Sequence, residues 1–269
     1  MAINAWLALG FGYLGAVFGS FAGATTWRLK HHKDIVKDRS ECEHCHRKLT
    51  ALDLVPIFSW LVLTGRCRYC RKPIGWSALL FELGLGLTFA LTYVFWPGGL
   101  ATGLDQAMFG LWLVGLVLMA ILFAYDLKWY TLPDVVMAPL IAVGLAIFLT
   151  RAAQAGWSVE QAGLELLLGL LPVTGLYGLL FAVSRGRWVG DSDPILGIFI
   201  GLALGWQLAL LSVVVANFIG LAAVLPQLVS SRLKAQDQVP FGPSLILATI
   251  VCLWWGQALI DWYFGWLVI

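Results

Sequence analysis

The sequence predicts an all-α polytopic membrane protein with about eight transmembrane helices and a small cytoplasmic zinc-ribbon-like insertion between the first two. Of the 269 residues, 60% are hydrophobic and 12% are charged, whereas soluble domains carry about 25% charged residues. Several apolar runs reach the roughly 20 residues that a bilayer-spanning helix needs. These runs are continuous rather than alternating, which argues against a β-barrel.

The first apolar run, 5–27, lacks the basic start of a cleavable signal peptide and is predicted to be a retained helix rich in glycine, which favours close packing. The polar segment 28–76 follows, and its short apolar stretch, 54–63, is typical of an interfacial helix. The remaining membrane helices are predicted at 77–96, 107–125, 134–150, 163–183, 194–205, 208–225 and 244–263. Pro172 predicts a kink. We expect three parts: helix 1–27, the cytoplasmic segment 28–76 and a catalytic helical bundle, 77–269.

The basic residues predict the orientation of the chain in the membrane. With eight helices, sixteen of the seventeen Lys and Arg residues fall on one side, and Arg151 alone falls on the other. Because cytoplasmic loops are enriched in Lys and Arg, both termini are predicted outside and the cysteine segment inside. The lipid bilayer is therefore an expected partner, and the net charge of +2 gives no indication of nucleic acid.

Four cysteines lie in the polar segment as two C-x-x-C pairs separated by 21 residues. Such spacing is typical of a zinc ion held by four thiolates. The predicted ligands are Cys42, Cys45, Cys67 and Cys70. Four thiolates leave no open position for water, so the metal would be structural. The alternatives are reduced thiols or a redox pair, and His44 and His46 are competing ligands.

Two acids at the predicted cytoplasmic face are candidates for catalysis. Asp126 ends an apolar run, and Asp191 follows Gly190 just before a later helix. Two carboxylates that share a site separate their pKa values, so that one can activate water while the other donates a proton. In the alternative interpretation both are helix-boundary residues. That interpretation suits Asp191 and Asp193, which precede a helix, better than Asp126, which follows one.

Two further acids have weaker signals. Glu82 lies near the cytoplasmic end of the second membrane helix, where it is expected to serve a polar site or to pair with an arginine. Asp134 lies near a helix start and is expected to be a cap.

Several motifs, taken in order, resemble the type IV prepilin peptidase family of bacterial inner membranes. They are Gly19-Ser20-Phe21 with Arg28-Leu29, Cys42-x-x-Cys45, Val55-Pro56-Ile57-Phe58-Ser59-Trp60-Leu61, Gly65-Arg66-Cys67-Arg68-Tyr69-Cys70, Asp126 with Leu132-Pro133-Asp134, Gly190-Asp191 and Pro240-Phe241-Gly242-Pro243. These motifs span nearly the whole chain. Three positions depart from the family pattern, namely Trp188, Asp193 and Gly23.

The resemblance implies a membrane aspartic endopeptidase with Asp126 and Asp191 as its catalytic pair. It implies cleavage of the basic leader of prepilins or pseudopilins at the cytoplasmic face, in type IV pilus assembly or protein secretion. It also implies methylation of the new N-terminus from S-adenosylmethionine, and zinc on the four cysteines.

Two other hypotheses remain open, and a third is weaker. The protein could be a peptidase that lacks methyltransferase activity, or a non-enzymatic membrane scaffold whose zinc ribbon recruits a partner. A transporter is disfavoured, because the charged residues gather at one face rather than at the midplane of the membrane, where transport sites are expected.

Overall fold

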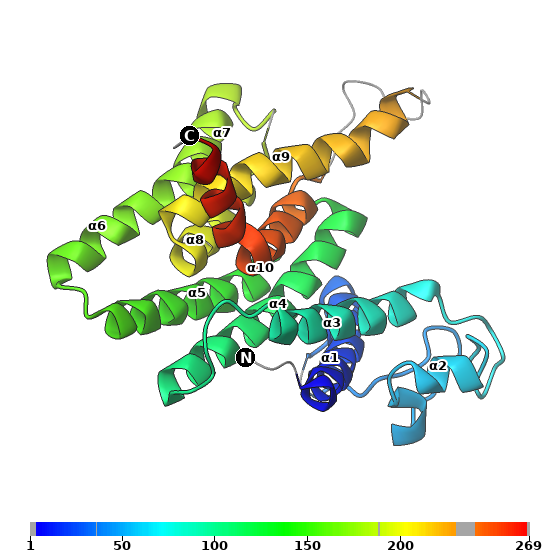
Figure 1. Ribbon diagram of the computed structural model, residues 1–269. Helices are drawn as coiled ribbons and strands as arrows, with labels where there is room; N and C mark the ends of the chain where they lie inside the picture. The colour runs from blue at the N-terminus through cyan, green and yellow to red at the C-terminus, as the bar shows by residue number, and fades with distance from the viewer. Residues whose placement is uncertain (1–3, 36, 188, 230–239, 268–269) are drawn as a thin grey trace. The chain divides into compact units, whose positions relative to one another are not determined.

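The computed structural model describes the backbone of residues 4–35, 37–187, 189–229 and 240–267 (Figure 1). Within these ranges every regular element is helical, and only two isolated β-bridges occur, so the predicted all-α class is confirmed. Seven described spans are long and apolar enough to cross a membrane: α1 (Ala5–Lys30), α3 (Trp76–Val94), α4 (Gly103–Trp129), α5 (Asp134–Ala155), Val159–Ser184, Trp206–Pro226 and Gly242–Trp266. The chain is therefore a multi-pass membrane protein.

The eighth predicted crossing is shorter than expected. Helix α8 (Asp193–Leu204) has 12 residues, about 18 Å of helix, and α9 (Trp206–Val229) begins two residues after it ends. Gly205 separates the two helices with a φ of +77°, a backbone conformation that glycine adopts without strain. The boundary predicted between the helices 194–205 and 208–225 is therefore present, at Gly205.

The chain forms two compact units. The first comprises residues 1–95 and 116–121, and the second comprises 96–115 and 122–269. The domain boundaries expected from the sequence stay a prediction. The predicted loop 230–238 and Trp188 lie outside the described residues.

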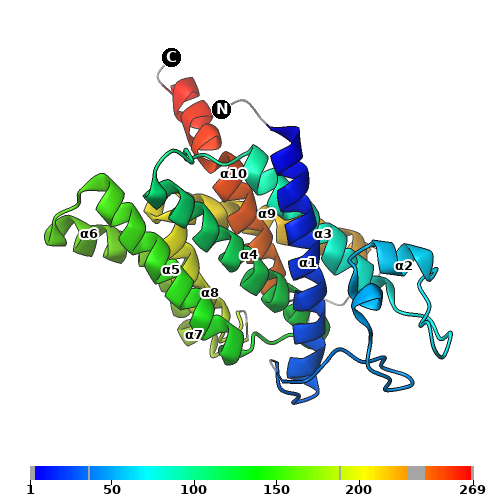
Figure 2. The same ribbon diagram turned by 90° about the horizontal axis from the view of Figure 1, so that it is seen from below.

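In the first unit, α1 and α3 lie side by side (Figure 2). Their contact depends on small residues, because a Cβ on Gly15 would lie 2.5 Å from the Leu85 carbonyl oxygen and 2.8 Å from Phe89. The glycines of the first helix therefore permit the close packing that the sequence predicted.

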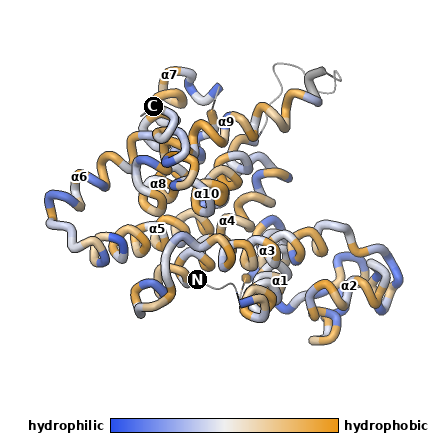
Figure 3. Tube along the Cα trace, in the orientation of Figure 1, coloured by the Kyte–Doolittle hydropathy of each residue, from blue (hydrophilic) through white to orange (hydrophobic). Residues whose placement is uncertain are grey.

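The polar segment that follows α1 contains little regular structure. It holds the 3₁₀ turn η1 (Ala51–Leu54) and the short helix α2 (Phe58–Val62), and its trace is mostly hydrophilic in Figure 3, in contrast to the long helices. The helix predicted at 54–63 is shorter than expected, because Ile57 has a φ of +66° that no right-handed helix accommodates.

In the second unit, α5 packs against α8, and α9 packs against α10 (Gly242–Leu267) (Figure 1). The span Val159–Ser184 consists of α6 (Val159–Leu170), the π-helical segment η2 (Leu171–Gly175) and α7 (Leu176–Ser184). Pro172, where a kink was predicted, lies inside this π-helix. Single π-helical turns occur frequently at functional sites.

Candidate functional site

A buried acid of the second unit lies in the last turn of α4. Asp126 is 5% exposed, and the helix ends at Trp129, after which Tyr130 adopts a left-handed conformation. The carboxylate of Asp126 accepts a hydrogen bond from the backbone N–H of Gly242. A Cβ on Gly242 would lie 2.5 Å from Asp126 Oδ2, so a glycine is needed at this position.

Gly242 is the first residue of α10. The first amides of a helix lack partners within the helix, and the helix dipole favours an anion there. The predicted motif Pro240-Phe241-Gly242-Pro243 thus forms a helix start that holds the Asp126 carboxylate.

A second acid, Asp193, lies at the start of α8. It is 6% exposed, and its Oδ2 accepts a hydrogen bond of 3.1 Å from the Gly190 N–H. Repulsion from the carboxylates of Asp126 and Asp191 reaches the Asp193 carboxylate. Asp126 and Asp193 therefore lie in the same unit, within range of each other's charge, and each accepts a hydrogen bond from a glycine amide.

The acid that the sequence paired with Asp126 has different surroundings. Asp191 is exposed, and its Oδ1 accepts a hydrogen bond of 3.0 Å from the Ser192 hydroxyl. Its assignment as a catalytic residue stays a prediction. Gly190 contributes its amide to Asp193, and Asp134 is exposed in the first turn of α5, where an acid complements the helix dipole.

In the sequence Asp193 stands as a departure from the family pattern and as a residue that precedes a helix, and it was not among the predicted site residues. A signal for it existed, because Asp193 directly precedes Pro194, and proline is favoured in the first turn of a helix. That placement fixes Asp193 on the helix, whereas Asp191 remains in the preceding loop.

The four predicted zinc ligands form a cluster in the first unit. Their Sγ atoms all lie within 4.8 Å of one another, and those of Cys42 and Cys70 are 3.8 Å apart. A tetrahedral zinc site with Zn–S bonds of about 2.3 Å needs sulfur atoms roughly 3.8 Å apart. The donor set and its spacing therefore fit a structural metal ion.

The two cysteine pairs form matching turns. The Cys42 N–H donates to the Arg47 carbonyl at 3.0 Å, and the Cys67 N–H donates to the Lys72 carbonyl at 2.9 Å. Burial alone would raise the pKa of the Cys67 thiol, but the amides of Cys70 and Tyr69 and the thiols of Cys42 and Cys70 lower it to about 7. Burial and the Cys67 and Cys45 thiols raise the pKa of Cys42 to about 11, so of these two neighbouring thiols Cys67 ionises first.

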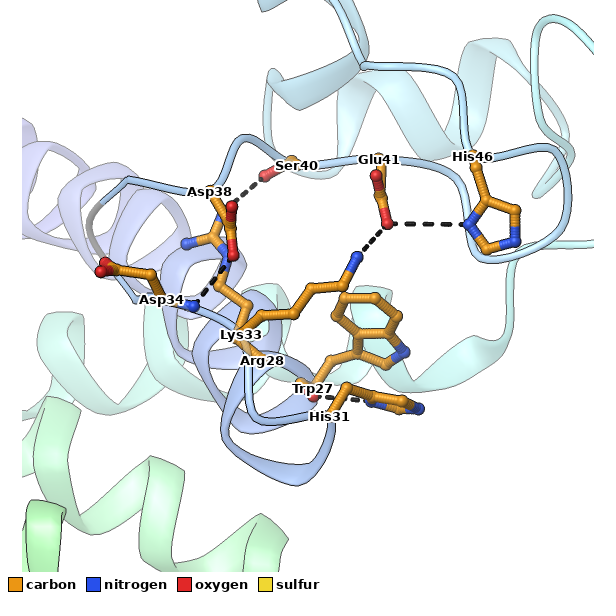
Figure 4. A network of polar contacts seen from close by, with 9 residues as sticks. All are labelled: Trp27, Arg28, His31, Lys33, Asp34, Asp38, Ser40, Glu41 and His46. Carbon is orange, nitrogen blue, oxygen red and sulfur yellow. Dashed lines mark hydrogen bonds and ion pairs between the residues drawn. The ribbon is translucent and has the colours of Figure 1, made fainter.

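A polar network joins the end of α1 to the first cysteine turn (Figure 4). Lys33 pairs with Glu41, and Glu41 lies 3.7 Å from His46 Nδ1. Arg28 donates to the Ile35 carbonyl at 3.0 Å and to the Ser40 hydroxyl at 3.3 Å. Among the described residues, the group of side chains that could hold a metal ion consists of the four cysteines. The ring of His46, one of the competing ligands, lies against Glu41.

Asp53 joins η1 to the second cysteine turn. Its Oδ1 accepts a hydrogen bond of 2.6 Å from Arg68 Nε, and its other oxygen accepts from the Thr50 hydroxyl at 2.8 Å. Burial raises the pKa of Asp53, but the bonds from Arg68 and Thr50 outweigh it and hold the pKa below its usual value.

Glu82 of α3 binds the strained turn before α2. It is 6% exposed and accepts hydrogen bonds from the Ile57 N–H, at 2.6 Å, and from the Ser20 hydroxyl. The Phe58 N–H donates to the Pro56 carbonyl at 2.6 Å, so Ile57 is the central residue of a γ-turn with positive φ, which is rare and strained. Glu82 therefore holds this turn against α1 and α3. Its predicted role as a supporting residue of a site stays a prediction.

Comparison with known proteins gives two family profiles that match in succession. Residues 13–96 match the bacterial peptidase A24 N-terminal domain, and residues 113–225 match the type IV leader peptidase family. No solved structure matches the chain.

Three curated relatives are each named prepilin leader peptidase/N-methyltransferase. The protein from Dickeya chrysanthemi is 30% identical over 258 residues, which cover 87% of this chain and 88% of the relative. The protein from Aeromonas hydrophila is 33% identical over 235 residues, covering 86% and 76% of the two chains. The protein from Stutzerimonas stutzeri is 29% identical over 224 residues, covering 83% and 74%.

Proposed function

This chain belongs to the type IV leader peptidase family, and we propose that it is an aspartic endopeptidase that removes the basic leader of prepilins or pseudopilins at the cytoplasmic face of the bacterial inner membrane. The observation that carries the aspartic mechanism is the pair of buried acids, Asp126 and Asp193. Each carboxylate accepts a hydrogen bond from the backbone amide of a glycine, and the charge of Asp126 acts on Asp193.

The reaction uses the two carboxyl groups in opposite protonation states. One ionised carboxylate removes a proton from a water molecule, whose oxygen adds to the carbonyl carbon of the scissile peptide. The protonated carboxyl group donates its proton to the carbonyl oxygen of the scissile peptide. Collapse of the tetrahedral intermediate breaks the C–N bond, and a proton passes to the leaving amine. The shared proton belongs to the pair, and neither acid alone keeps one role.

Burial and proximity support this division of protonation states. Two like charges in a site with little water repel each other, so a state with one proton shared by the pair is favoured over two bare carboxylates. The amides of Gly242 and Gly190 hold the two carboxyl groups by backbone contacts, which keeps their orientation when the proton moves.

Methyl transfer is the second proposed activity, because the relatives carry N-methyltransferase in their names. S-adenosylmethionine would supply the methyl group to the new N-terminal amine and leave as S-adenosylhomocysteine, and the amine loses a proton. A peptidase without this activity is the alternative. Mass analysis of the processed pilin decides, because each methylation makes the N-terminus one CH₂ heavier.

Zinc would be held by the thiolates of Cys42, Cys45, Cys67 and Cys70. A fully thiolate-ligated zinc ion stabilises the fold and offers no position for a reacting water. A non-enzymatic scaffold would use the same metal site, but its function would not depend on Asp126 or Asp193.

Three Asp→Asn variants test the peptidase proposal in a cleavage assay with purified prepilin. Asp126→Asn and Asp193→Asn should each lower kcat by at least about 10²-fold, the range expected for loss of a general acid or base, while the protein still accumulates in the membrane. Asp191→Asn tests the other arrangement, in which Asp191, the acid that the family resemblance pairs with Asp126, is the catalytic partner.

Other outcomes of this assay have distinct meanings. Retained cleavage by Asp126→Asn would rule out the aspartic mechanism. Loss in Asp191→Asn together with activity in Asp193→Asn would restore Asp191 as the partner. Full biological function of all three variants, with loss of function in the cysteine variants, would favour the scaffold.

A further inference from the structure

A buried tyrosine lies beside the proposed pair of acids. Tyr177 is the second residue of α7, which follows directly on the π-helix η2, and its side chain is 4% exposed. Its ring packs against that of Phe241, with centroids 5.4 Å apart. Phe241 directly precedes Gly242, whose amide holds Asp126, so the tyrosine contacts the helix start that binds one acid.

The hydroxyl of Tyr177 has a defined orientation. Its oxygen accepts a hydrogen bond of 3.4 Å from Asn217 Nδ2 of α9. The same amide nitrogen donates to the Val213 carbonyl at 2.8 Å, which fixes the Asn217 side chain on its own helix. Because Asn217 is the donor, the tyrosine keeps its own O–H proton for another acceptor.

The segment that carries Tyr177 packs against the helix of the other acid. The charge of Asp193 acts on Tyr177, and α8 lies in direct contact with η2. A Cβ on Gly197, one turn beyond Asp193, would lie 2.8 Å from the Thr174 backbone nitrogen. Thr174 is one turn before Tyr177, so the π-helical segment brings the tyrosine to the helix that carries Asp193.

We propose that Tyr177 is a further catalytic residue, which donates a hydrogen bond to the carbonyl oxygen of the scissile peptide. The proposal rests on the proposed peptidase function. When water adds to the carbonyl carbon, negative charge develops on that oxygen, and a fixed donor stabilises it more than it stabilises the substrate. Tyr177 keeps its proton throughout, so the proton balance between water, the two acids and the leaving amine is unchanged.

The test replaces the hydroxyl and keeps the ring. Tyr177→Phe in the full chain should lower kcat for prepilin cleavage by about 10²-fold, the loss expected for one donor to a developing oxyanion, with KM changed less than about twofold. Tyr93→Phe is the matched control, because Tyr93 is also buried and stacked on an aromatic ring, Phe11, in the first unit. It should leave kcat unchanged.

A double variant shows whether Asn217 acts through the tyrosine. Asn217→Ala should lower kcat, because the hydroxyl loses the donor that orients it. In the Tyr177→Phe background the same substitution should have little further effect, since two residues that act as a unit are not additive. Independent, multiplicative losses would overturn the assigned orientation.

The remaining outcomes separate the two proposals. An unchanged kcat in Tyr177→Phe, or a fall in kcat that is matched by a similar fall in the control, would overturn the role of Tyr177 even if Asp126→Asn is inactive. Cleavage by Asp126→Asn would overturn the proposed function itself, whatever the tyrosine variant does.

Discussion

At Gly242 the proposed site depends on the absence of a side chain. Gly242→Ala would place a methyl group 2.5 Å from Asp126 Oδ2, so the carboxylate must move away from the amide that holds it. A displacement of about 1 Å at a catalytic group can cost on the order of 10²-fold in rate. We expect such a loss of kcat in prepilin cleavage.

Gly110→Ala provides the control for this substitution. Gly110 lies in α4, and a Cβ added there would have no neighbouring atom within 4 Å, so an alanine meets open space. The variant should keep full activity and gain roughly 0.5–1 kcal/mol of helix stability. Equal activity of the two variants would mean that the bond between Gly242 and Asp126 is not used in catalysis.

The residues of the site were predictable to different degrees. Asp126 could be found from the sequence, because an acid at the end of a long apolar run carries an evident cost. The family motif pointed to Asp191 as its partner, whereas the proposal of Asp193 depends on how the turn before α8 directs two carboxylates only two residues apart, which the sequence alone does not determine. Tyr177 carried no signal, since a tyrosine in a membrane helix is most often an ordinary packing residue.

Among the elements, the pair α1 and α3 offers a direct test of glycine packing. Gly15→Leu would force a side chain into the Leu85 carbonyl and the Phe89 ring. Overpacking of a close contact costs about 1–3 kcal/mol or more, so the variant should accumulate less in the membrane and unfold at a lower temperature in detergent.

Gly10→Leu lies on the same helix, with open space around the added Cβ, and serves as its matched control. It should behave like the unmodified protein in both measurements. If the two leucine variants were equally stable, the close contact between α1 and α3 would contribute little to folding.

Helix positions followed from the sequence more readily than their irregularities. The long apolar runs determine where the membrane helices lie, because few other segments can satisfy their backbone in lipid. The γ-turn at Ile57 could not be predicted, since positive φ at a β-branched residue is disfavoured locally. Glu82 stabilises it from a helix distant in the sequence.

At the scale of the whole molecule, metal removal should affect the polar segment and leave the long helices in place. Cys67→Ser should lower the zinc content measured on purified protein and increase proteolysis between residues 39 and 74. Helical content by circular dichroism should change little, because η1 and α2 contain only 4 and 5 residues.

Cys252→Ser is the control for metal binding, because Cys252 is buried in α10 and is not part of the sulfur cluster. It should retain zinc and the resistance of the polar segment to protease. Unchanged zinc content in Cys67→Ser would contradict the four-thiolate site.

The topology of the chain depends on whether the short helix α8 completes a crossing. The guanidinium of Arg151, near the end of α5, donates to the Ala203 carbonyl at 3.5 Å, next to the end of α8. Arg151 is 17 residues beyond Asp134, the first residue of α5, which is about 25 Å along the helix. The end of α8 therefore reaches the level of the far end of α5, and the chain can reverse there through Gly205.

This arrangement predicts eight crossings, with both termini on the outer side of the membrane. Reporter enzymes that are active only outside should be active when fused before residue 4 or after residue 267, and inactive when inserted near Lys37. Opposite signals at the two termini would mean seven crossings.

If α8 did not cross the membrane, the acids of α4 and α8 would still share a face, because both lie before the end of α8. The loop before α10 would move to the other side, however, and could not supply Gly242 to Asp126. The observed bond between these two residues is therefore itself an argument for the even count.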